Sequence, residues 1–176
     1  ERMLDQIYDA WIEIVDLPLV ERAAIEPELE TRIENMSSRF SVVQMSVPAM
    51  SGWLRAQDSI DASLRATLLM LAIEVYRAEH GVLPAALDDL KPTVLDDLPR
   101  EPVAADGRFI YRLENSEPLG YILYSIGGDG LDDGGTTPAD GEWHDAFDRD
   151  AAGVDAVFSR LRPIPEVDAE PGFDDE

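Results

Sequence analysis

Apolar residues recur along residues 48–81 at intervals that suit one long helix. Most intervals are three, four, or six to seven residues, which matches a helical stripe and not the alternation of a strand. The stripe consists of Met50, Trp53, Leu54, Ile60, Leu64, Leu68, Leu71 and Val75. Pro48 suits the first helical turn, and Gly81 suits the position just past the last turn. We therefore predict a helix over residues 48–81.

The second half of this helix is apolar on almost every side. Residues 66–76 leave almost no polar face, so we expect them to be buried on several sides and to form the spine of the core. Leu71 is expected to be a core residue whose truncation destabilises the fold. The apolar run is about half of the ~20 residues that a membrane span needs, which favours a core helix.

Two further helical regions precede the long helix. Residues 3–16 predict an amphipathic helix with one apolar face formed by Leu4, Ile7, Tyr8, Trp11 and Val15. Pro18 ends this helix, and Pro27 is expected at the first position of a later helix. The apolar face of that later helix is Leu29, Ile33 and Met36. Residues 37–47 suit either a strand or a connecting segment.

Strands are predicted after the long helix. Pro84 opens a short helical turn through Lys91, and a proline-rich extended crossing follows. Residues 109–113 and 121–126 predict two paired strands, and residues 154–161 predict a third. The fold class is α+β: N-terminal helices and one long spine helix packed on a small antiparallel sheet. We expect a helical extension at 1–47, an α+β domain at 48–162 and an acidic mobile tail at 163–176.

The charge of the chain limits its partners. Thirty-seven Asp and Glu stand against 14 Lys and Arg, for a net charge of -23. We expect no nucleic-acid partner, because the phosphate backbone needs a cationic surface. A cation, a protein partner or like subunits remain compatible, and so does an acidic surface that serves only solubility. Cysteine is absent, which excludes disulfides and thiolate metal sites. A first residue other than Met indicates a trimmed or processed product, with any anchor upstream.

A loop rich in Gly and Asp follows the second predicted strand. Residues 127–142 contain six glycines and four aspartates, and Asp129, Asp132 and Asp133 fall within five residues. Clustered carboxylates repel one another unless a cation or solvent screens them, and a flexible loop of oxygen ligands suits Ca²⁺. A solvated acidic turn is the alternative. The order of the EF-hand loop is absent.

Two segments of the chain have distinctive sequences. The first is Leu71-Ala-Ile-Glu-Val-Tyr-Arg-Ala-Glu-His-Gly-Val-Leu-Pro84, and the second is Leu123-Tyr-Ser-Ile-Gly-Gly-Asp-Gly130. Together they resemble major pseudopilins of type II secretion systems (the G-type family): the first is similar to the end of the family's long helix, and the second to the segment that leads into the family's calcium loop. The resemblance covers about residues 62–135. Similar segments occur in uncharacterised pseudopilin-like proteins of planctomycete-type bacteria.

The resemblance implies a set of calcium ligands. It places the loop Asp at Asp129 and the ligating backbone carbonyl at Ile126, with Asp132, Asp133 and Asp140 as candidates later in the loop. It also implies an extracytoplasmic location and an upstream membrane anchor. The 60 residues before the matching segment depart from the family, because they form amphipathic helices and no membrane stem.

We therefore expect a non-enzymatic, extracytoplasmic, pseudopilin-like structural or assembly domain with a structural Ca²⁺ site. We expect no catalytic residues, because the two histidines lack a metal-site or triad pattern. His80 suits a helix C-terminal position. The alternatives are an interaction module that docks through its N-terminal helices and a carboxylate-based hydrolase, for which an acidic chain allows no residue pair to be chosen.

Overall fold

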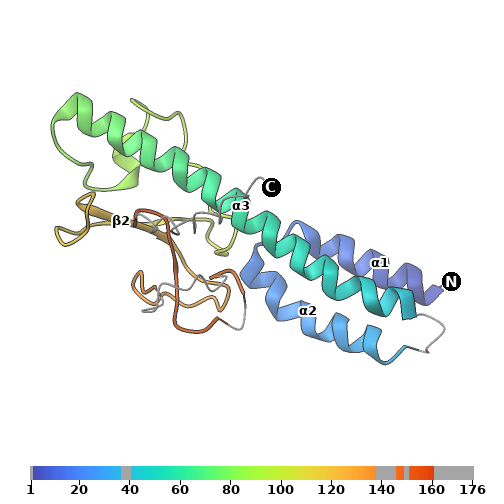
Figure 1. Ribbon diagram of the computed structural model, residues 1–176. Coiled ribbons are helices and arrows are strands. Elements are labelled where there is room, and N and C mark those ends of the chain that lie inside the picture. The colour runs from blue at the N-terminus through green and yellow to red at the C-terminus, as the bar shows by residue number, and fades with distance from the viewer. Residues whose placement is uncertain (1, 37–40, 138–145, 149–150, 161–176) are drawn as a thin grey trace, which may run out of the picture.

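The computed structural model describes residues 2–36, 41–137, 146–148 and 151–160 (Figure 1). Two shorter helices lie beside one half of a long helix, and a small sheet lies beside its other half. The elements in chain order are α1 (Arg2–Val15), α2 (Leu19–Glu34), α3 (Ser41–His80), the 3₁₀ helix η2 (Leu87–Leu90), β1 (Ile110–Leu113), β2 (Tyr121–Ser125) and β3 (Ala156–Val157). The predicted tail at 163–176 lies outside the described residues.

The sheet is an antiparallel meander with β2 in the centre. Ile110 of β1 lies opposite Tyr124, and Ala156 of β3 lies opposite Ser125. All five residues of β2 are buried. The α+β class and the order of helices before strands are confirmed, while the third strand is shorter than predicted.

Two helix starts differ from the prediction. α2 continues through Pro27, and α3 begins at Ser41, before Pro48. A proline inside a helix costs about 3 kcal/mol. In α2, Leu29 and Ile33 follow Pro27 one turn apart on the same face of the helix, and their burial helps to offset that cost. The end of α3 is as predicted, because Gly81 follows His80 with φ 74°, a left-handed conformation that glycine adopts without strain.

The N-terminal helices form a core of their own with the first half of α3. On α1 the buried residues are Ile7, Trp11 and Ile14, whereas Tyr8 and Val15 are exposed. The buried face of α1 is therefore rotated by part of a turn from the face that the sequence predicted. The side chain of Leu4, which was also predicted on that face, lies outside the described part. These residues form one cluster together with Leu29, Ile33, Met36 and Leu54.

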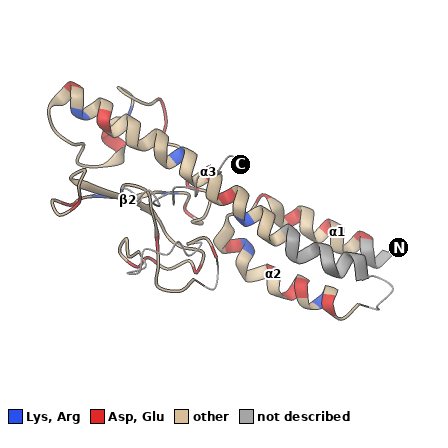
Figure 2. Cartoon of the chain, in the orientation of Figure 1, with Lys and Arg blue, Asp and Glu red and all other residues tan. Residues whose placement is uncertain are grey.

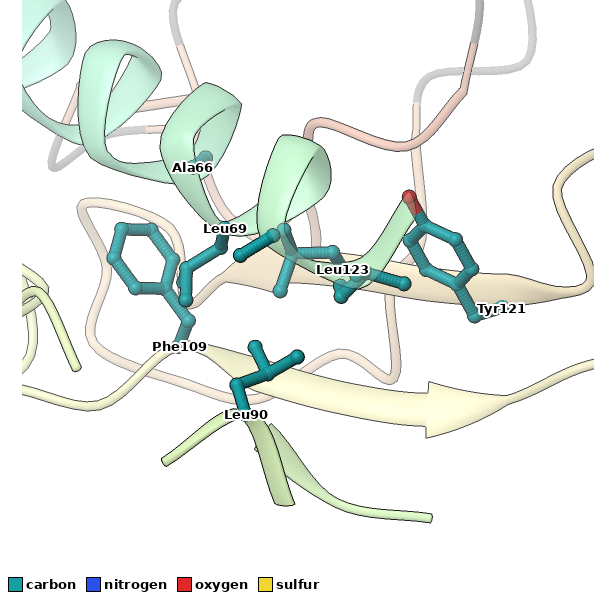
Figure 3. Packing of buried hydrophobic residues seen from close by; sticks show 8 residues of the cluster. Ala66, Leu69, Leu90, Phe109, Tyr121 and Leu123 are labelled. Carbon is teal, nitrogen blue, oxygen red and sulfur yellow. The ribbon is translucent and has the colours of Figure 1, made fainter. Parts of the chain in front are cut away.

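The second half of α3 packs on the sheet with a different face from the one predicted. Ala66, Leu69, Ala72 and Ile73 are buried and share a cluster with residues of β2, as Figure 3 shows for Ala66 and Leu69. Leu71 is 61% exposed, so its predicted place in the core was wrong. A helix that is apolar all round does not show which side is buried, and here the alanines allow the sheet to approach closely.

A buried ion pair joins α2 to α3. Arg22, 1% exposed, donates to Glu26 at 3.1 Å and to Asp58 of α3. Burial raises the pKa of Asp58, and the contact with Arg22 opposes that rise. Within the described residues, no helix has both the length and the apolar character to cross a membrane.

Candidate functional site

The Gly/Asp loop leaves β2 and packs at once against a later part of the chain. The amide of Gly128 donates to the carbonyl of Ala146 at 2.7 Å, and the amide of Gly130 donates to that of Gly127 at 3.0 Å. A Cβ at Gly128 would lie 2.4 Å from the carbonyl oxygen of Phe147. The glycine at position 128 therefore allows the loop to turn inward against backbone.

Asp129 and Ile126, the two ligands implied by the resemblance, lie close to other protein groups. One carboxylate oxygen of Asp129 accepts from the amide of Leu131 at 3.0 Å, and the other accepts from that of Gly153 at 3.1 Å. The carbonyl oxygen of Ile126 lies 2.9 Å from the Ser125 hydroxyl oxygen, whose single proton is directed to Glu101 at the shorter distance of 2.8 Å. Asp129 therefore joins the start of the loop to the segment before β3.

Asp132 accepts hydrogen bonds from the strand before the loop and from the loop itself. Its Oδ1 accepts from the Tyr124 hydroxyl at 2.9 Å and from the amide of Gly134 at 2.9 Å. Burial, first, and the hydrogen bond and negative charge of Asp132 together raise the pKa of Tyr124 to about 12, so the phenol keeps its proton and donates. This contact fixes the loop to the central strand.

Asp133 lies close to a carboxylate that the sequence analysis missed, that of Asp155. Asp155 is 2% exposed, and its Oδ2 accepts from the amide of Gly135 at 2.7 Å. Within the described part of the chain, Asp155 Oδ1 and Asp133 Oδ2 are buried and have no hydrogen-bond donor. A signal for Asp155 was present in the sequence, because it is an acidic residue between Val154 and Ala156 in a segment predicted as a strand.

The electrostatics of Asp155 reflect these neighbours. Burial raises its pKa, and the negative charges of Asp132 and Asp133 raise it further. The backbone amide of Gly135, which donates to Oδ2, and the nearby amide of Asp133 lower it in part. Burial and the neighbouring carboxylates therefore disfavour the ionised form of Asp155.

Two arginines contact the backbone carbonyls of the loop. Arg112 donates to the carbonyl of Gly134 at 2.7 Å, and Arg160 donates to that of Gly135 at 3.0 Å. Arg160 also pairs with Glu117 at 2.6 Å. These guanidinium groups neutralise part of the loop's charge, but no hydrogen bond joins either of them to Asp133 or Asp155 in the described residues.

The structure brings together only part of the predicted set. Asp132, Asp133 and Asp155 are electrostatic neighbours, while Ile126 and Asp129 contact other groups. In the part of the chain that is described, no three acidic or histidine side chains are already arranged as a metal site. Asp140, a further candidate, lies outside the described residues. No family model, curated protein or solved structure matches this chain.

Proposed function

We propose that this chain is a non-enzymatic, pseudopilin-like structural domain that binds one Ca²⁺ ion in its Gly/Asp loop. The observation that carries the calcium site is the pair of buried carboxylate oxygens, Asp133 Oδ2 and Asp155 Oδ1, for which the described residues supply no donor. A bound cation supplies the positive charge that such oxygens need. Ca²⁺ suits them because it takes carboxylate and carbonyl oxygens in flexible arrangements.

The cost of the present arrangement favours a bound ion. A buried polar atom without a partner costs roughly 1 to 3 kcal/mol, and more when it is charged. Asp132 adds a third carboxylate beside the pair, and Gly134 and Gly135 have positive φ, which lets the backbone turn at this point. The proposed ligands are therefore Asp133 and Asp155, with Asp132 beside them. An alternative position for the ion is the one that the resemblance implies, with Asp129 and the carbonyl of Ile126 as ligands.

The order of elements supports the pseudopilin-like assignment. A long helix packs on an antiparallel sheet, and the Asp loop follows directly after the central strand, as in the family that residues 62–135 resemble. We include in the proposal an extracytoplasmic location and an anchor upstream of this chain. In this role the ion holds the end of the sheet against the segment before β3.

Thermal unfolding with and without calcium tests the site. Binding only to the folded state stabilises by RT ln(1 + [L]/Kd), about 2.7 kcal/mol at a hundredfold excess over Kd. Millimolar Ca²⁺ should raise the Tm of the chelator-treated protein, and Mg²⁺ should raise it much less because it requires a tighter octahedral shell. Isothermal calorimetry should give one site per chain.

Three charge-removing variants locate the ion. Asp155→Asn should abolish the Ca²⁺-dependent rise in Tm if the ion lies at the Asp133 end of the loop, and Asp129→Asn should abolish it if the ion lies at Ile126. The matched control is Asp88→Asn, which removes one charge near η2, away from the loop. No calcium binding at millimolar concentration, with a Tm insensitive to chelator, would leave an acidic loop held by arginines and overturn the proposal.

A second candidate function, an interaction module, has its own observation. Tyr8, Ile12 and Val15 stand at helical spacing on α1, and all three are exposed. Tyr8→Glu and Ile12→Glu should leave the Tm nearly unchanged and should abolish capture of any partner that binds through this helix.

A further inference from the structure

α3 has one side that is apolar and uncovered by any described residue. We call it the α3 face and define it by six residues that are between 45% and 66% exposed: Trp53, Ile60, Leu64, Leu68, Leu71 and Val75. The sheet and the N-terminal helices contact the helix through other residues, such as Leu54 and Leu69. Among the described residues the α3 face is therefore an exposed surface, although its side chains are of the kinds that usually form a protein core.

The spacing of these residues makes the α3 face straight. Positions 53, 64 and 75 are eleven residues apart, and so are positions 60 and 71. Eleven residues are close to three full turns of an α-helix, so the face drifts little around the helix. From Trp53 to Val75 it is about 33 Å long.

The α3 face carries no charge in a chain whose net charge is -23. Residues 53–75 are all described, and their other exposed members are Ala56, Gln57 and Thr67. The nearest acidic groups, Asp61 and Glu74, pair with Arg65 at 2.6 Å and Arg77 at 2.5 Å on the same helix. Figure 2 shows, by contrast, acidic residues spread along α1 and α2.

We propose that the α3 face binds a second copy of this chain, with the two α3 helices antiparallel and a two-fold axis at Leu64. A basic partner would find no charge to bind here, whereas two copies of so acidic a chain repel one another everywhere except at an uncharged face. The pattern is also symmetric about Leu64. Trp53 and Val75 are each eleven residues away from it, and Ile60 and Leu68 are each four.

That symmetry makes the face complementary to itself. In an antiparallel pair, Trp53 lies against the partner's Val75 and Ile60 lies against the partner's Leu68, as an isologous two-fold interface requires. Leu71 lies against the uncharged Gln57 of the other copy. A strip of this length and one helix wide has a footprint of roughly 350 to 400 Å² per copy, about half that of a standard interface. The dimer is therefore weak, and it does not depend on the calcium site.

Sedimentation equilibrium over a range of protein concentrations tests the dimer. Leu64→Glu places two carboxylates face to face at the axis and should weaken dimerisation at least about a hundredfold. The matched control is Leu113→Glu, which makes the same change at an exposed leucine on β1 and should leave the Kd unchanged. Because salt screens the repulsion between two acidic copies, dimerisation should strengthen as NaCl rises from 20 to 500 mM.

Single cysteines introduced into this cysteine-free chain determine the orientation. Leu64→Cys should form a disulfide-linked dimer on mild oxidation. Trp53→Cys alone should not, because its two copies are about 33 Å apart in the antiparallel pair, but it should crosslink to Val75→Cys when the two variants are mixed. Efficient crosslinking of Trp53→Cys alone would show a parallel pair and overturn the arrangement.

Two results would overturn the proposed partner. A chain that stays monomeric at 1 mM protein and 500 mM NaCl does not dimerise through this face. Monomeric binding to phosphatidylcholine vesicles, lost in Leu64→Glu and kept in Leu113→Glu, would assign the α3 face to a membrane surface instead.

Discussion

The hydroxyl of Ser125 donates a 2.8 Å hydrogen bond to Oε1 of Glu101, which ties the last residue of β2 to the proline-rich crossing. Oε2 of the same carboxyl accepts from the amides of Val103 at 2.8 Å and Ala104 at 2.5 Å. Glu101 is 2% exposed, and burial raises its pKa to about 7, against the opposing effect of these three donors. One buried carboxyl thus holds the crossing against the central strand.

Glu101→Gln should change how stability depends on pH. With a folded pKa of about 7 and an ordinary value of 4.5, the folded protein keeps a proton between these values that the unfolded chain has lost. Glu101 therefore contributes stability at low pH that is lost as the pH rises through 7. In urea unfolding, the free energy of unfolding of the variant relative to that of the wild type should therefore increase by up to about 3 kcal/mol from pH 4 to pH 8.

The control for this prediction is Glu79→Gln, which removes the same charge from an exposed position at the end of α3. Subtracting its pH profile removes the general effect of lowering the net charge. A Glu101→Gln profile that coincides with that of the control would show that Glu101 titrates in the folded protein as it does in the unfolded chain.

Leu69 and Leu71 should respond very differently to truncation. Leu69 is fully buried against the sheet, so Leu69→Ala should lower the free energy of unfolding by roughly 2 to 5 kcal/mol. Leu71 is 61% exposed, so Leu71→Ala should cost less than about 0.5 kcal/mol. Urea melts at low micromolar protein, where the proposed dimer is not populated, measure both. Equal losses would contradict the burial of one face of α3.

Gly128 and Gly52 should respond in opposite directions to alanine. A Cβ at Gly128 would meet the backbone of Phe147 and Asp148, which cannot move as the end of a side chain can. Gly128→Ala should therefore destabilise by about 1 to 3 kcal/mol. At Gly52, inside α3, a Cβ has nothing within 4 Å, so Gly52→Ala should stabilise by roughly 0.5 to 1 kcal/mol. Their Tm values, compared with the wild type, test both predictions.

Local patterns in the sequence determined which elements form. The helical spacing of residues 53–75, the glycine at 81 and the β-branched and aromatic residues of 121–125 predict α3, its end and β2, because helix and strand periods are properties of neighbouring residues. The helix starts were predicted less well. The cost of Pro27 is local, while the packing of Leu29 and Ile33 that helps to offset it is not.

Only the tertiary structure decided what these elements contact. Residues 66–76 are apolar on almost every side, so their sequence could not show that Leu69 is buried and Leu71 exposed; that choice depends on where the sheet packs. Asp133 and Asp155 are 22 residues apart, and they become neighbours because β3 pairs with β2 beside the loop. The sequence by itself predicted an acidic loop at the end of a strand, and long-range packing decided which of its carboxylates face one another.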